Sequence, residues 1–121
     1  MSFARTFFGD IPTSQLGFTY SHEHIVCLPG HWVERGETDL LLDDPAKSEL
    51  DVEEFVQAGG KTIVDATAVD YGRCVEDVAG IARRTGVQVI GTGGFNKGFL
   101  WDARLTRRLR GIVGNFDTYG E

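Results

Sequence analysis

The chain has 121 residues, a length typical of one domain, with 12 lysine and arginine residues, 18 aspartate and glutamate residues and a net charge of −6. This acidic balance argues against a nucleic-acid partner and against an anionic membrane surface as a partner. No apolar run is long enough to span a membrane, and the first residues do not have the build of a signal peptide, so we expect a cytoplasmic protein.

The first twelve residues predict a short β-hairpin. Residues 2–8 favour a strand, and residues 9–12 are typical of a turn in which Pro12 stops further strand pairing. The apolar, β-prone run over 17–20 then predicts the strand that follows the hairpin.

Two histidines stand two residues apart where this predicted strand ends. Side chains alternate between the faces of a strand, so His22 and His24 should share one face while Glu23 points away. Two imidazoles placed in this way can bind the same metal ion. The helical zinc-protease motif does not fit, because the residue four positions after His22 is Val26. Taken alone, the pair is explained equally well as two surface histidines on a half-exposed strand.

Residues 26–43 show no clear periodicity and predict a long loop over the end of this strand. The loop contains His31, which we expect to be solvated rather than a ligand because nothing fixes its geometry. Cys27 and Cys74 form no Cys-x-x-Cys pair, so we expect two reduced thiols without a role in zinc binding.

The following residues alternate helices and strands. A helix is predicted over 44–58, with Asp44 as its N-cap, and a second helix over 73–84. Strands are predicted over 62–66 and 87–92, each after a glycine that ends a helix. This alternation indicates parallel β-α-β units with right-handed crossovers. The apolar helix positions expected to face the sheet are Val52, Phe55, Val56, Val75, Val78, Ala79 and Ala82.

Beyond these strands we predict a loop over 93–98 and a short basic helix over 102–110. We interpret the arginines of this helix as a solvated helix end rather than a phosphate or nucleic-acid patch, because positive charge suits a helix C-terminus. These arginines are Arg104, Arg107, Arg108 and Arg110.

Polar side chains gather at the predicted strand ends: His22, His24, Asp65, Thr67 and Thr92. In parallel α/β folds, ligands bind at the carboxyl ends of the strands, so these residues are better candidates than similar residues elsewhere. Asp65 also has a structural interpretation, which we favour, as a carboxylate that accepts hydrogen bonds from nearby backbone amides.

In these features the sequence resembles the phosphotriesterase family of the amidohydrolase superfamily. Order and spacing agree as well as residue types, over roughly residues 7–100. The resemblance implies an α/β fold, the N-terminal part (about three β/α units) of a (β/α)8 TIM barrel, preceded by the hairpin. The matching stretches are 9–11, 16–19, 22–24, 58–67, 72–73, 85–87 and 91–93.

The resemblance also implies a metal-dependent hydrolase that acts on phosphotriesters, lactones or related esters at a two-metal centre, usually zinc. His22 and His24 match the first-strand metal ligands, and in such enzymes a metal-bridging hydroxide attacks the substrate. Phe95 and Asn96 are candidates for the substrate loop. Many family members carry an aromatic residue near the position of Asn96, so the substrate preference does not transfer.

The remaining ligands of the family are a carboxylated lysine on the fourth strand, histidines on the fifth and sixth and an aspartate on the eighth. Lys61 and Lys97 lie in the wrong segments to supply the lysine, and no residue matches a catalytic position. We therefore expect one partial barrel domain, family-like to about residue 105 and divergent over 106–121, that is truncated and inactive alone. The alternative is a non-catalytic α/β remnant that acts as an oligomeric or binding protein.

Three parallel strands cannot close into a barrel, so we expect self-association through the open strand edges. The face formed by Ile63, Val87 and Val89 would also lack its opposite wall. In a competing arrangement, residues 26–43 and the tail from Gly111 fold back over the open side.

Overall fold

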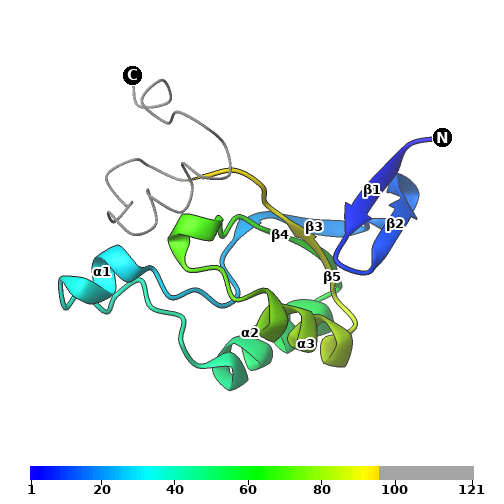
Figure 1. The fold of residues 1–121 in the computed structure, drawn as a ribbon. Helices are drawn as coiled ribbons and strands as arrows, with labels where there is room; N and C mark the ends of the chain where they lie inside the picture. The colour runs from blue at the N-terminus through cyan, green and yellow to red at the C-terminus, as the bar shows by residue number, and fades with distance from the viewer. Residues whose placement is uncertain (96–121) are drawn as a thin grey trace, which may run out of the picture.

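The computed structural model of the chain describes residues 1–95. It shows a β-hairpin followed by three parallel strands that alternate with helices (Figure 1). The strands are β1 Phe3–Thr6, β2 Gly9–Pro12, β3 Phe18–Glu23, β4 Gly60–Asp65 and β5 Gln88–Gly91. The helices are α1 Gly30–Glu34, α2 Pro45–Gln57 and α3 Val75–Thr85, with short 3-10 turns at Thr13–Gln15 and Val69–Tyr71.

The predicted hairpin is confirmed, but its turn lies earlier than expected. Residues 9–12 form strand β2, which pairs antiparallel with β1 so that Phe3 lies opposite Pro12. Proline is tolerated there because it ends an edge strand, where its missing amide hydrogen removes no interior ladder bond. Arg5 and Asp10 lie opposite each other and form an ion pair of 2.8 Å across the hairpin.

The parallel sheet has the order β3-β4-β5, as the alternation of elements predicts. Glu23 pairs with Asp65, and Asp65 pairs with Gly91, so the three strands end at one edge of the sheet. Helices α2 and α3 lie side by side on one face of the sheet, and the hairpin lies where the strands begin (Figure 1).

Both long helices begin or end as the sequence predicts. The Asp44 carboxylate accepts hydrogen bonds from the amides of Ala46 and Lys47 at the start of α2. Gly86, with a φ of +75°, ends α3 in the left-handed conformation that glycine adopts at low cost. These local signals explain why both helices can be predicted within one or two residues.

The hydrophobic core lies between the sheet and the two helices. Ile63, Val87 and Val89 are at most 3% exposed, so the expectation that their face lies open is wrong: it is the helix-covered face. Val75 is 45% exposed at the first position of α3, also against expectation, and Ile81 is buried instead. The buried core residues are Ile25, Val26, Val52, Ile63, Val78, Ile81, Ala82, Val87 and Val89.

Residues 26–43 do not form the uninterrupted loop that the sequence predicts, because α1 lies within them. Val26 and Cys27 are buried, and Cys27 forms isolated β-bridges with Leu42 and Arg73. The start of this segment therefore packs against the rest of the chain, whereas Leu40 and Leu42 further along it are 45% and 39% exposed.

Three predictions fall outside the described residues: the loop beyond Phe95, the basic helix over 102–110 and the divergent tail over 106–121. Asn96 lies there as well. Within residues 1–95, no helix has the length and apolar composition needed to cross a membrane.

Candidate metal centre

The carboxyl ends of β3 and β4 hold the candidate site together. The amide of Ala66 donates a hydrogen bond of 2.8 Å to the carbonyl of Glu23, so the chain leaving β4 runs directly beside the end of β3. Through this contact, residues 22–24 on one strand meet residues 65–67 on the next. Strand pairing alone therefore brings two of the three predicted polar strand ends together.

The two histidine rings are neighbours at this edge. The ring centroids of His22 and His24 lie 5.5 Å apart, with the ring planes at 77°. Two imidazoles bound to one tetrahedral zinc ion, at the usual bond length of about 2.0–2.1 Å, have centroids roughly 5 Å apart. The separation is thus compatible with one shared ion. His22 is exposed, whereas His24 is half-buried.

His24 is held by several contacts. Its Nδ1 lies 2.9 Å from the hydroxyl oxygen of Thr67, and its ring centroid lies 5.0 Å from that of Tyr71. Its backbone amide donates to the Glu23 carboxylate over 3.2 Å. Burial is the largest cause that lowers the pKa of His24; His22 lowers it further, while Asp65 and Glu23 oppose the shift. A lowered pKa favours the neutral imidazole, the form that binds metals.

Asp65 accepts hydrogen bonds as its structural interpretation predicts. It is 3% exposed, and its Oδ1 accepts from the Thr67 amide over 3.0 Å and from the Thr67 hydroxyl over 2.5 Å. Thr67 itself is fully buried. The carboxylate therefore fixes the turn that leaves β4.

The remaining candidates are Thr92, Phe95 and His31. The carbonyl of Thr92 accepts a hydrogen bond from Arg73 over 2.9 Å. Phe95 is 36% exposed at the end of the described chain. His31 belongs to α1 rather than to a loop, and the structure describes only its backbone.

The two cysteines are free, in agreement with the sequence prediction. Burial is the main cause that raises the pKa of both thiols, Cys27 and Cys74. Because the thiolate is the form that binds zinc, this shift disfavours both as ligands.

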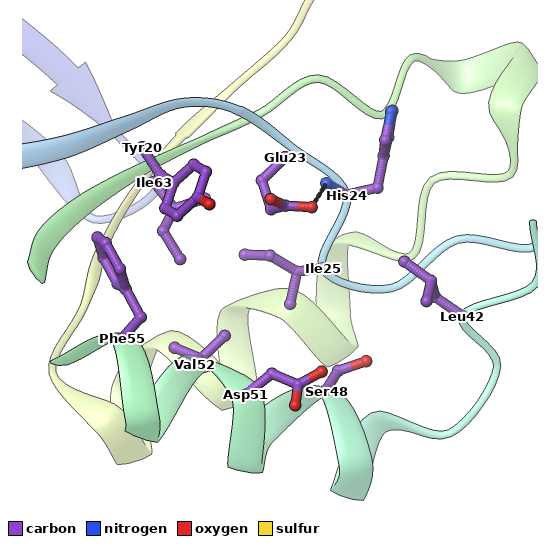
Figure 2. A pocket seen from close by; sticks show the side chains of 10 residues that line it. All are labelled: Tyr20, Glu23, His24, Ile25, Leu42, Ser48, Asp51, Val52, Phe55 and Ile63. Atoms are coloured by element: carbon purple, nitrogen blue, oxygen red, sulfur yellow. Dashed lines mark hydrogen bonds between the residues drawn. The ribbon is translucent and has the colours of Figure 1, made fainter. Parts of the chain in front are cut away.

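A cavity of about 280 Å³ lies beside the histidine pair, between the sheet and α2. Figure 2 shows the Glu23 carboxylate within this cavity, while the His24 ring points away from it. Glu23 and His24 thus take opposite sides, as strand alternation predicts. The cavity walls are largely apolar, with Ile25, Val52, Phe55 and Ile63 among them.

Sequence reasoning missed the contacts that His24 makes with Thr67 and Tyr71. The sequence offered one signal, the polar residues at the ends of two neighbouring predicted strands, but it did not give the register that pairs His24 with Thr67. In the part of the chain that the structure describes, no three or more His, Cys, Asp or Glu side chains gather in a group that could hold a metal ion.

Comparison with known proteins places these features in a family. The sequence model of the phosphotriesterase family matches residues 1–112. A phospho-furanose lactonase of Mycoplasmopsis synoviae (strain 53) is 36% identical over 103 residues, which cover 83% of this chain and 29% of that protein.

Solved structures show the same likeness. A lactonase from Listeria monocytogenes is 64% identical, with a TM-score of 0.84 over 95% of this chain and 35% of the lactonase. An organophosphorus hydrolase from Deinococcus radiodurans is 29% identical, with a TM-score of 0.66 over 93% of this chain and 34% of the hydrolase. The chain therefore spans about a third of the length of these proteins.

Proposed function

Since the chain belongs to the phosphotriesterase family, we propose that it carries the first-strand ligands of a metal-dependent hydrolase site. Its fold is the N-terminal part of a (β/α)8 barrel, about three β/α units after a hairpin. The observation that carries the proposal is the separation of 5.5 Å between the rings of His22 and His24 at the end of a parallel strand.

The two imidazoles would hold one divalent ion, with zinc as the first candidate because zinc favours nitrogen ligands. When bound, such an ion polarises a carbonyl or phosphoryl oxygen and lowers the pKa of a bound water. The protein contributes a half-buried His24, held by contacts with Thr67 and Tyr71, and an exposed His22. Two ligands leave at least two positions of a tetrahedral ion open.

We propose a small-molecule lactone, ester or phosphotriester as the substrate of the complete site. The relatives with named activities support this class, being two lactonases and an organophosphorus hydrolase. They give no support to the alternative of a non-catalytic remnant. Because the chain covers only about a third of these relatives, we further propose that it does not turn over substrate alone. Metal-dependent hydrolysis by the purified chain, lost on His22→Ala, would contradict this proposal.

Zinc titration by calorimetry tests the metal site. We expect wild type to bind one ion weakly, since two imidazoles supply half of a tetrahedral shell, and the double variant His22→Ala/His24→Ala to lose this binding. His31→Ala is the matched control, because it removes one histidine outside the pair. Equal binding by wild type and the double variant would show that the pair is not the site.

A further inference from the structure

We propose that Thr67 and Asp65 are positioning residues that hold the His24 imidazole in a single tautomer, with Nδ1 protonated and Nε2 free to bind a metal. The proposal deepens the proposed function and rests on it for the metal. It assigns a role to two buried residues that are not themselves ligands. The observations are two consecutive hydrogen bonds, from His24 to Thr67 and from Thr67 to Asp65.

The direction of these hydrogen bonds follows from the chemistry of the three groups. An ionised carboxylate only accepts, so the Thr67 hydroxyl donates its one proton to Asp65 Oδ1. The same hydroxyl oxygen lies 2.9 Å from His24 Nδ1 and has no second proton to give. The imidazole must therefore donate from Nδ1, which leaves the lone pair of the neutral ring on Nε2.

Because Thr67 and Asp65 are buried, their hydrogen bonds favour one tautomer of His24 over the other. Thr67 is fully buried and Asp65 is 3% exposed, so water does not compete freely for either group. The second hydrogen bond to Asp65, from the Thr67 amide over 3.0 Å, keeps the carboxylate in place even when the hydroxyl is removed. The opposite tautomer would leave the Thr67 oxygen facing a nitrogen lone pair, an unsatisfied buried contact.

Other contacts orient the same ring. The Tyr71 ring packs against it, with centroids 5.0 Å apart, and Glu23 accepts a hydrogen bond from the His24 backbone amide. His22, by contrast, is exposed. The two histidines thus differ: His24 is held by contacts with Thr67 and Tyr71, whereas the His22 side chain is exposed.

The consequence for metal binding follows from general experience with metal sites. A ligating histidine usually donates its other ring nitrogen to a carboxylate, carbonyl or water, and loss of such a partner typically costs 10–100-fold in metal affinity. Here a threonine hydroxyl stands between the ring and the carboxylate. We expect the same range of loss when the hydroxyl is removed.

The direct test is nitrogen-15 NMR of the histidine rings in the metal-free chain at about pH 8, where neutral imidazole predominates. We expect His24 of wild type to be protonated at Nδ1, and His22 to exchange between tautomers. Thr67→Val keeps the size and the backbone hydrogen bond but removes the hydroxyl, so His24 should become a tautomer mixture. Thr67→Ser restores a hydroxyl and should restore the single tautomer. An unchanged His24 spectrum in a folded Thr67→Val variant would overturn the proposal.

Asp65→Asn provides a second test that leaves the hydroxyl in place. The amide both donates and accepts, so the Thr67 hydroxyl can reverse its direction and the other His24 tautomer should become populated. A retained single Nδ1-protonated tautomer in this variant would show that the carboxylate does not set the direction.

Zinc titration of the same variants separates this proposal from the metal site itself. Thr67→Val should lower zinc affinity 10–100-fold, and Thr67→Ser should regain most of it. If the tautomer changes but zinc affinity does not, positioning has no effect on binding and that part of the proposal is overturned. If wild type shows the single tautomer but binds no zinc, the hydrogen-bond network stands and the proposed function fails.

Discussion

Gly72 is the residue at which the structure tolerates a side chain least. Its φ is +74°, and a Cβ added there would lie 2.0 Å from the carbonyl oxygen of Leu28. The Leu28 amide donates to the Gly72 carbonyl over 2.9 Å, so this close approach joins the chain after β3 to the turn that carries Tyr71. The contact thus supports the loops that flank the histidine pair.

We predict that Gly72→Ala lowers the free energy of unfolding by about 2–5 kcal/mol. About 1–2 kcal/mol comes from the left-handed backbone, and about 1–3 kcal/mol from forcing a methyl group against the backbone. Gly36→Ala is the matched control, because Gly36 has a φ of +71° with nothing within 4 Å of an added Cβ. Urea unfolding of both variants measures the loss of unfolding free energy in each. Equal losses in Gly72→Ala and Gly36→Ala would show that the contact with Leu28 adds nothing.

The individual site residues were predictable to different degrees. His22, His24 and Asp65 can be identified from the sequence because they are polar residues at the ends of predicted strands. The shared face of His22 and His24 follows from their spacing of two residues on a strand. The partnership of Thr67 with His24 does not, because it depends on the register between two strands 43 positions apart in the sequence. Register of this kind is set by packing of the whole sheet.

At the level of elements, an ion pair joins the two long helices. Arg84 near the end of α3 contacts Glu49 of α2 at 2.6 Å and donates to both of its carboxylate oxygens. The hydrogen bond from Arg84 is the main cause that lowers the pKa of Glu49 below its ordinary 4.5. The Arg84 side chain is 58% exposed and the Glu49 side chain 20%, so the pair lies at the protein surface.

The lowered pKa of Glu49 determines how the stability contributed by this ion pair changes with pH. Glu49 has a lower pKa in the folded chain, so its contribution to stability is present above about pH 4.5 and is lost as the pH falls through the folded-state pKa. We predict that Glu49→Gln makes the unfolding free energy fall less steeply below pH 4.5 than in wild type. Glu54→Gln on the same helix is the control. The prediction would be contradicted if the unfolding free energy of wild type and of Glu49→Gln fell equally steeply below pH 4.5.

The elements also differ in how far the sequence predicts them. Helices α2 and α3 carry their own boundary signals, Asp44 and Gly86. The sequence of residues 9–12 predicts a turn because it contains glycine and proline within four residues, but an edge strand accepts both and these residues form β2. Helix α1, with five residues, is too short to show a periodicity.

For the molecule as a whole, the exposed edge of β3 is where association between chains is expected. Within the described residues it pairs on one side with β4, and Phe18 and Tyr20 are 69% and 51% exposed on it. Both rings lie near Phe55 of α2, with centroid distances of 6.3 and 5.5 Å. An exposed strand edge with aromatic side chains favours pairing between chains.

We predict that the purified chain associates in a concentration-dependent manner, and that Tyr20→Lys weakens this association by placing a charge on the edge. Leu50→Lys is the control, since Leu50 is 60% exposed but belongs to α2 and not to strand β3. Size-exclusion chromatography with light scattering measures the mass at several concentrations. A sharp monomer peak near 13.3 kDa at every concentration, with cooperative unfolding, would show that the chain closes its own core.

The most direct test of the metal centre is X-ray absorption at the zinc edge, with one zinc ion added per chain. We predict a first shell of nitrogen and oxygen at about 2.0–2.1 Å, with the outer-shell scattering of two imidazoles that disappears in His22→Ala/His24→Ala. A sulfur shell at about 2.3 Å, or a spectrum unchanged in the double variant, would contradict the assignment of His22 and His24 as the metal ligands.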